Sequence, residues 1–75
     1  MYWNYRITDA NDNTITYADS LVVAQSEALR LAPTLDTMAL SVIRCADDTI
    51  FAQFGMTIHG QIAYRLSITD TFRIL

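Results

Sequence analysis

The sequence predicts an α+β fold in which one helix packs on one face of an antiparallel sheet of about five strands. Three observations predict it: two alternating apolar–polar stretches at the start of the chain, one amphipathic stretch, and three more alternating stretches after it. This ββαβββ order is typical of a two-layer α+β domain. Because the chain has only 75 residues, we expect one domain spanning residues 1–75.

The first two predicted strands form a hairpin. Residues 2–8 alternate between apolar and polar side chains, and residues 14–18 alternate again after an interruption. The interruption, residues 9–13, reads Asp-Ala-Asn-Asp-Asn, and Asp and Asn side chains favour turns. The apolar side of this hairpin is predicted to consist of Trp3, Tyr5, Ile7, Ile15 and Tyr17.

The helix is predicted over residues 21–32. Asp19 or Ser20 can supply an N-cap oxygen, the apolar residues recur at three- or four-residue spacing, and Pro33 ends the pattern. Ala24 and Ala28 lie on the predicted inner face, where small side chains allow the helix to approach the sheet closely.

The chain after the helix contains a predicted meander. Its strands are predicted at residues 38–46, 49–58 and 61–69. Asp47 and Asp48 mark the first turn, and His59 with Gly60 marks the second. The pattern leaves open whether residues 72–75 form a separate strand.

The composition favours a binding protein. Apolar residues make up 52% of the chain and charged residues only 17%, so we expect a partner or a second copy to cover part of the apolar surface. The formal charge is −3, with five arginines and no lysine, which disfavours generic binding to nucleic acid. A lone cysteine favours a reducing compartment, and no secretory or membrane segment is visible, so we expect a cytoplasmic protein.

The sequence contains weak candidates for catalysis. Cys45 with His59 resembles a nucleophile and a base, but sequence alone does not bring the two side chains together. The paired acids at Asp9 and Asp12, and again at Asp47 and Asp48, are explained by turn formation. We therefore expect no enzymatic activity, no cofactor and no metal site.

Two surfaces are candidates for binding a partner. The first is an acidic end, where the predicted meander brings together Asp19, Asp47, Asp48 and Asp70. The second is the sheet face opposite the helix, because Ile43 and Phe51 are out of phase with the apolar faces of their strands. If the helix covers Trp3, Ile15, Phe54 and Tyr64, the opposite face carries Tyr2, Arg6, Ser41, Ile43, Phe51, Gln53, Arg65 and Arg73.

The hairpin followed by Ala18-Asp19-Ser20-Leu21, leading into Ala24, Ala28 and Ala32, resembles the small phage-encoded anti-CRISPR proteins of ββαβββ form. The resemblance implies a non-catalytic inhibitor that docks on a host CRISPR surveillance complex in the host cytoplasm and blocks its binding of nucleic acid.

Two alternatives stay open. One is a nucleic-acid-binding module that uses Tyr2, Arg6, Phe51 and Arg65. The other is a homo-oligomer, a homodimer in the simplest case, that associates through the same face or through the edge strand ending at Leu75.

Overall fold

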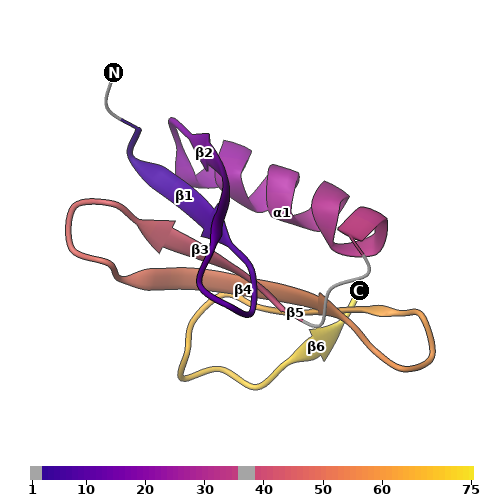
Figure 1. Cartoon of the computed structure of the whole chain (residues 1–75). Helices are drawn as coiled ribbons and strands as arrows, with labels where there is room; N and C mark the ends of the chain where they lie inside the picture. The colour runs from indigo at the N-terminus through magenta and orange to yellow at the C-terminus, as the bar shows by residue number, and fades with distance from the viewer. Residues whose placement is uncertain (1–2, 36–38) are drawn as a thin grey trace.

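The computed structural model describes residues 3–35 and 39–75, with the side chains of residues 34 and 35 left out. Within these residues it contains one helix and a six-stranded antiparallel sheet, so the predicted α+β class is confirmed with one more strand than expected. The sheet order is β2-β1-β3-β4-β5-β6 (Figure 1). The elements are β1 (Tyr5–Thr8), β2 (Thr14–Ala18), α1 (Leu21–Leu35), β3 (Leu40–Arg44), β4 (Ile50–Met56), β5 (Ile62–Arg65) and β6 (Arg73–Ile74).

The β1–β2 turn forms where the Asp and Asn residues predict it. The Asp9 carboxylate accepts hydrogen bonds from the backbone N–H groups of Asn11 and Asn13, both at 2.9 Å. Asp12 adopts a left-handed φ of 64°, a conformation that Asp and Asn tolerate better than most residues. The side chains of the turn therefore bond to its own backbone.

The helix begins as predicted and ends later than predicted. The Ser20 hydroxyl accepts a hydrogen bond from the backbone N–H of Val23 at 3.2 Å, which caps the first turn. The predicted end at Ala32 is wrong, because α1 continues to Leu35 with Pro33 inside it. Pro33 lies within the last turn, so its missing N–H removes a hydrogen bond close to the place where the helix stops.

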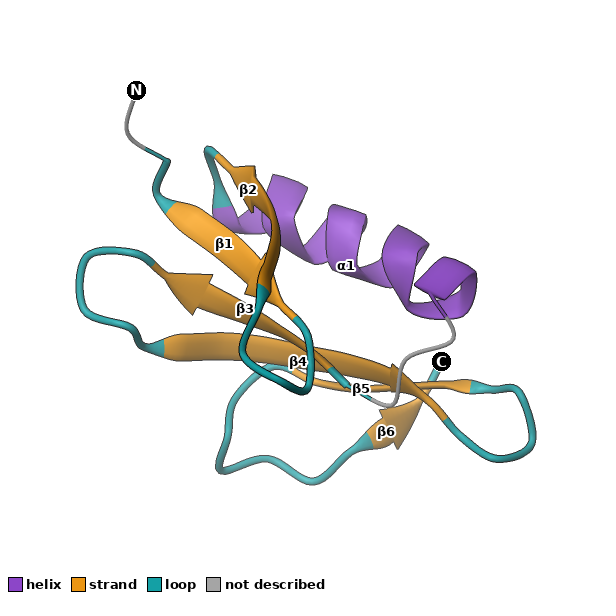
Figure 2. Cartoon of the chain, viewed as in Figure 1, coloured by secondary structure: helices purple, strands orange, loops and turns teal. Residues whose placement is uncertain are grey.

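The core forms between the helix and strands β1 to β4. Ala24, Ala28 and Ala32 are spaced four residues apart, form one stripe of α1 and are fully buried. Their small side chains bring the helix close to the sheet, where it packs chiefly on β3 and β4 and does not contact β6 (Figure 2). The strand residues buried beneath the helix are Ile7, Ala18, Leu40, Val42, Ala52 and Phe54.

The hairpin presents its residues to the helix differently from the prediction. Ala18 is buried and pairs with Tyr5, whereas Ile15 and Trp3 are each 37% exposed, so their predicted cover by the helix is wrong. Ala18 is followed after only two residues by the helix, so β2 lies close to α1 and a small side chain fits between them. The predicted first strand was also too long, because β1 starts at Tyr5.

The three predicted strands after the helix are shorter than predicted, and a separate strand, β6, follows the last of them. β5 ends at Arg65, a loop follows, and β6 returns to pair with β5 through Ala63↔Ile74 and Tyr64↔Arg73. This answers the question that the sequence left open about residues 72–75. No described helix is long and apolar enough to cross a membrane.

Candidate binding surfaces

The sheet face opposite the helix is called the open face. The register of the strands defines it, because Tyr17, Arg6 and Ile43 are aligned across β2, β1 and β3, and successive side chains of a strand point to opposite faces. Further along the sheet Ser41, Gln53 and Arg65 are aligned across β3, β4 and β5. Phe72 and Ile74 extend the open face at its β5–β6 side, and Ile43 within it is buried.

A chain of hydrogen bonds crosses the open face from β3 to β5. The Arg65 Nε donates to Gln53 Oε1 at 2.8 Å, and Gln53 Nε2 donates to Ser41 Oγ at 3.1 Å. Arg65 also donates to the backbone oxygens of Ile68 and Asp70, at 3.2 and 3.4 Å. These bonds hold Arg65 flat along the sheet.

Apolar side chains lie at the β5 end of this polar chain and, separately, on β2. Phe72 is half exposed, and its ring centroid lies 4.6 Å from the guanidinium carbon of Arg65, within the range of a cation–π contact. Ile74 on β6 and Tyr17 on β2 are about half exposed as well. The open face therefore combines an arginine, a glutamine and large apolar groups, a mixture found at protein interfaces.

Three residues predicted for the open face are not described there. Phe51 is on the helix side, because its ring meets Tyr5 edge to face with centroids 5.9 Å apart and lies 4.9 Å from the guanidinium carbon of Arg44. A bulge between Val42 and Ile43 shifts the register and inserts Phe51 as an extra residue, so simple alternation failed there.

Arg73 also lies on the helix side, because it pairs with Tyr64, which packs against the core. The separate strand β6 sets this register, which the sequence pattern did not fix. Tyr2 lies outside the described residues.

The antiparallel order brings the predicted acidic residues to one end of the molecule. The end of β2 with Asp19, the β3–β4 turn with Asp47 and Asp48, and the loop with Asp70 after β5 all lie at the end where β1 begins (Figure 1). Two of these four acids are paired with arginine, which reduces the negative charge of this end.

The first pair joins Arg44 and Asp47 across the β3–β4 turn. The guanidinium donates from Nε to Oδ1 at 3.0 Å and from Nη2 to Oδ2 at 2.5 Å, a two-pronged contact. The Arg44 hydrogen bonds hold the pKa of the Asp47 carboxyl well below its usual range, and the backbone N–H of Thr49 bonds to the same carboxylate. The Asp47 carboxylate is therefore already hydrogen-bonded within the turn.

The second pair joins Arg6 on the open face to Asp48. Arg6 Nη2 lies 2.7 Å from Asp48 Oδ1, and this hydrogen bond raises the pKa of Arg6 above its ordinary value. Asp48 has a left-handed φ of 59°, which directs the chain back into β4. The pair therefore neutralises Arg6, which was predicted for the open face, and Asp48, which was predicted for the acidic end.

Asp19 and Asp70 differ from these paired acids. No hydrogen bond or ion pair joins either carboxylate to another residue in the described ranges, although their backbone oxygens accept bonds from Asn4 and Arg65. Asp19 lines a cavity of about 600 Å³ at the start of the helix. The sequence did not predict this cavity.

The structure separates the residues considered for catalysis. Cys45 follows β3 rather than lying within a strand, and His59 lies in the turn after β4, at the opposite end of that seven-residue strand. At about 3.3 Å per residue they are roughly 20 Å apart along the strand, so they cannot share a proton. Among the described residues no three metal-binding side chains gather.

Comparison of the chain with protein-family models, with curated proteins and with solved structures found no match in any of the three. The resemblance to anti-CRISPR proteins therefore stays a prediction. Function has to be argued from the surfaces themselves.

Sequence reasoning missed part of each surface. Tyr17 belongs to the open face because it pairs with Arg6. The sequence signal for this was Ala18, a small residue close to a helix with an alanine stripe. The Arg44–Asp47 pair was also visible, since opposite charges three residues apart flank a turn. The cavity had no sequence signal, because it joins residues 3–5, 19–21 and 44–46.

Proposed function

We propose that this domain is a non-catalytic protein-binding inhibitor or adaptor that docks through its open face. The observation that carries the proposal is the contrast between exposed apolar groups and an ordered arginine on a sheet face that no described helix covers. Phe72 and Ile74 offer apolar area next to Arg65, and Tyr17 lies next to Arg6 at the other side of the sheet. Aromatic residues with arginine are enriched where binding energy concentrates.

A protein partner fits this face better than nucleic acid does. Arg6 is paired with Asp48, and Arg65 is held by Gln53 and by two backbone oxygens, so neither presents a free cation to phosphate groups. The net charge of −3 repels a polyanion as well. Apolar burial and a few hydrogen bonds are the remaining sources of affinity, and they suit a protein surface.

The acidic end contributes less than the sequence predicted. Asp47 and Asp48 already bind arginines, so a basic partner would have to compete with Arg44 and Arg6. The inhibition of a CRISPR surveillance complex, as the resemblance implies, is one form of the proposed binding, with the open face in place of the acidic end as the contact.

A capture experiment tests the proposal. The tagged protein is incubated with extract of its source cells and compared with the double variant Tyr17→Asp/Phe72→Asp on the open face. The double variant Val22→Asp/Val23→Asp adds the same charge on the exposed side of α1 and is the matched control. Nuclease is included in a parallel sample, and circular dichroism verifies that each variant is folded.

The expected result is a stoichiometric protein or ribonucleoprotein complex that the wild type and the helix variant capture and that the open-face variant loses. Capture that persists in the open-face variant contradicts the proposal, and so does capture of nucleic acid without any protein. The identity of the captured protein decides whether the partner is a CRISPR surveillance complex.

Self-association is a second candidate that one observation favours. The outer edge of β6 pairs with no described strand, and the residues around it are exposed: Leu66, Ile68, Phe72, Ile74 and Leu75. Such an edge is a template for pairing with another strand. Sedimentation over a hundredfold range of concentration distinguishes this candidate, because a constant monomer mass rejects it.

A further inference from the structure

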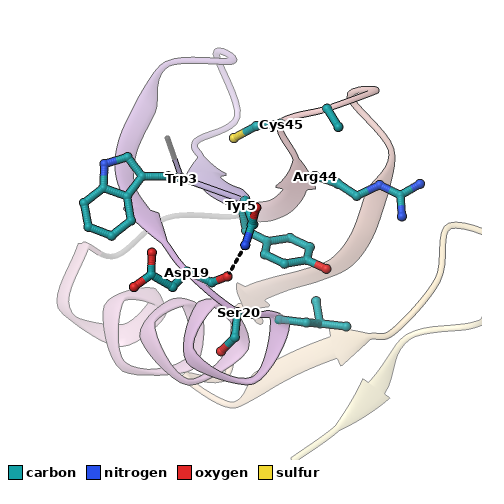
Figure 3. A pocket seen from close by; sticks show the side chains of 9 residues that line it. Trp3, Tyr5, Asp19, Ser20, Arg44 and Cys45 are labelled. Carbon is teal, nitrogen blue, oxygen red and sulfur yellow. Dashed lines mark hydrogen bonds between the residues drawn. The ribbon is translucent and has the colours of Figure 1, made fainter. Parts of the chain in front are cut away.

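The cavity at the start of α1 has an aromatic and acidic side. Trp3, Tyr5 and Leu21 supply apolar surface, and the Asp19 carboxylate lies beside the Trp3 indole (Figure 3). Trp3 is only partly buried, so its ring is accessible from solvent. A volume of about 600 Å³ lies within the range of ordinary ligand pockets.

The charges of this cavity are not balanced. Arg44 is the only arginine that lines it, and its guanidinium is bound by Asp47, lies over Phe51 and is turned away from Trp3 (Figure 3). The Asp19 carboxylate bonds to no other described residue. Among the described residues that line the cavity, the charge that remains unpaired is therefore negative.

From this geometry we infer that the cavity binds a cationic group, an alkylammonium or a guanidinium, between Trp3, Tyr5 and the Asp19 carboxylate. Aromatic faces attract cations through the ring quadrupole, and a neighbouring carboxylate adds a charge-assisted hydrogen bond. The group belongs either to a free small amine or to a lysine or arginine side chain of another protein.

An anion fits the cavity less well, although the helix N-terminus is near. The Ser20 hydroxyl already caps the N–H of Val23, and Asp19 places a negative charge at this end of the helix. A bound anion would face that carboxylate, while the nearest arginine is occupied. Because the cavity lies on the helix side of the sheet, its occupancy does not depend on the proposed protein-binding face.

Fluorescence offers a direct test, because Trp3 is the only tryptophan in the chain. Its emission is titrated at constant ionic strength with n-butylammonium and n-butylguanidinium, with butanol as the neutral probe and butyrate as the anionic one. We expect saturable changes with the two cations and only a weak linear change with butanol and butyrate. Equal fluorescence changes with the cations and with butanol, or larger changes with butyrate, would overturn the inference in the wild-type protein alone.

Variants then test whether the Asp19 carboxylate supplies the charge that attracts the cation. Asp19→Asn is expected to weaken cation binding about fivefold, the effect of losing one partly exposed ion pair. Asp70→Asn removes the same charge from an exposed loop and should leave binding unchanged. An unchanged affinity in Asp19→Asn, with circular dichroism showing a folded protein, overturns the inference.

The source of the cation is decided by a pair of blocked tripeptides, Gly-Arg-Gly and its citrulline analogue. Tighter binding of the arginine peptide than of butylguanidinium identifies a protein side chain as the ligand. Tighter binding of the free cation identifies a small amine or guanidine. Both results support the cationic site, whereas equal binding of the two peptides contradicts it.

Discussion

The two faces of the sheet are built from different side chains, and the difference separates folding from binding. The helix side is packed with alanine, valine, leucine and phenylalanine, and three alanines of α1 are fully buried against it. The open face instead carries a hydrogen-bonded Arg65 and Gln53 among half-exposed apolar groups. Stability thus comes chiefly from one face, and the other is free to contact a partner.

The largest predicted difference concerns two phenylalanines. Phe54 is buried beneath the helix and stacks with Tyr64, whereas Phe72 is half exposed on the open face. We expect Phe54→Ala to lower the free energy of unfolding by about 3–5 kcal/mol because it leaves a cavity. Phe72→Ala should lower it by no more than about 1 kcal/mol, the size of an exposed cation–π contact. Urea denaturation measures both, and similar losses would show that the open face also belongs to the folding core.

A smaller effect is expected on the helix itself. Ala28→Leu adds volume where the helix is closest to the sheet, so we expect a loss of about 1–3 kcal/mol from overpacking. Ser26→Leu places the same side chain on the exposed side of α1 and should change stability by less than about 0.5 kcal/mol. If both variants unfold at the same urea concentration, the alanine stripe does not set the helix–sheet distance.

The smallest predicted effect concerns the turn between β3 and β4. Arg44 lowers the pKa of Asp47 in the folded protein, so this pair stabilises the fold above the unfolded-state pKa of about 3.9. The stabilisation is lost as the pH falls through and below that value. Melting temperatures measured from pH 6 to pH 2.5 should therefore show wild type above Asp47→Asn at pH 6 and a smaller difference between the two at pH 2.5, because the folded-state pKa of Asp47 lies below its unfolded-state value.

Asp70→Asn is the control for this pH series, because its carboxylate bonds to no other residue in the part of the chain that the structure describes. It should follow the wild type throughout. A gap between wild type and Asp47→Asn that is as wide at pH 2.5 as at pH 6 means that the ion pair is not its cause.

The sequence predicted the layout well because layout depends on local patterns. Alternation located the strands β1 to β5 but did not identify β6 as a separate strand. Ser20 marked the helix start. Periodicity failed where tertiary structure changes the register. The bulge near Ile43 moves Phe51 to the helix side, and a second register shift, between β1 and β2, leaves Ile15 without a partner on β1 while Ala18 is buried.

The candidate surfaces were predicted less completely, for a related reason. Arg6 and Arg65 were placed correctly on the open face, but their partners come from residues 42 and 12 positions away in the chain. A charge count treats Asp48 as free, whereas the structure pairs it with Arg6. The cavity between Trp3 and Asp19 likewise depends on where the helix starts relative to β1.

The most direct test of the central claim is hydroxyl-radical footprinting of the complex with the captured partner. Tyr17 and Phe72 report on the open face, and Val22 and Val23 report on the exposed side of the helix. We predict that the partner protects Tyr17 and Phe72 and leaves the two valines as reactive as in the free protein. Protection of the valines with unchanged Tyr17 and Phe72 would contradict the assignment of binding to the open face.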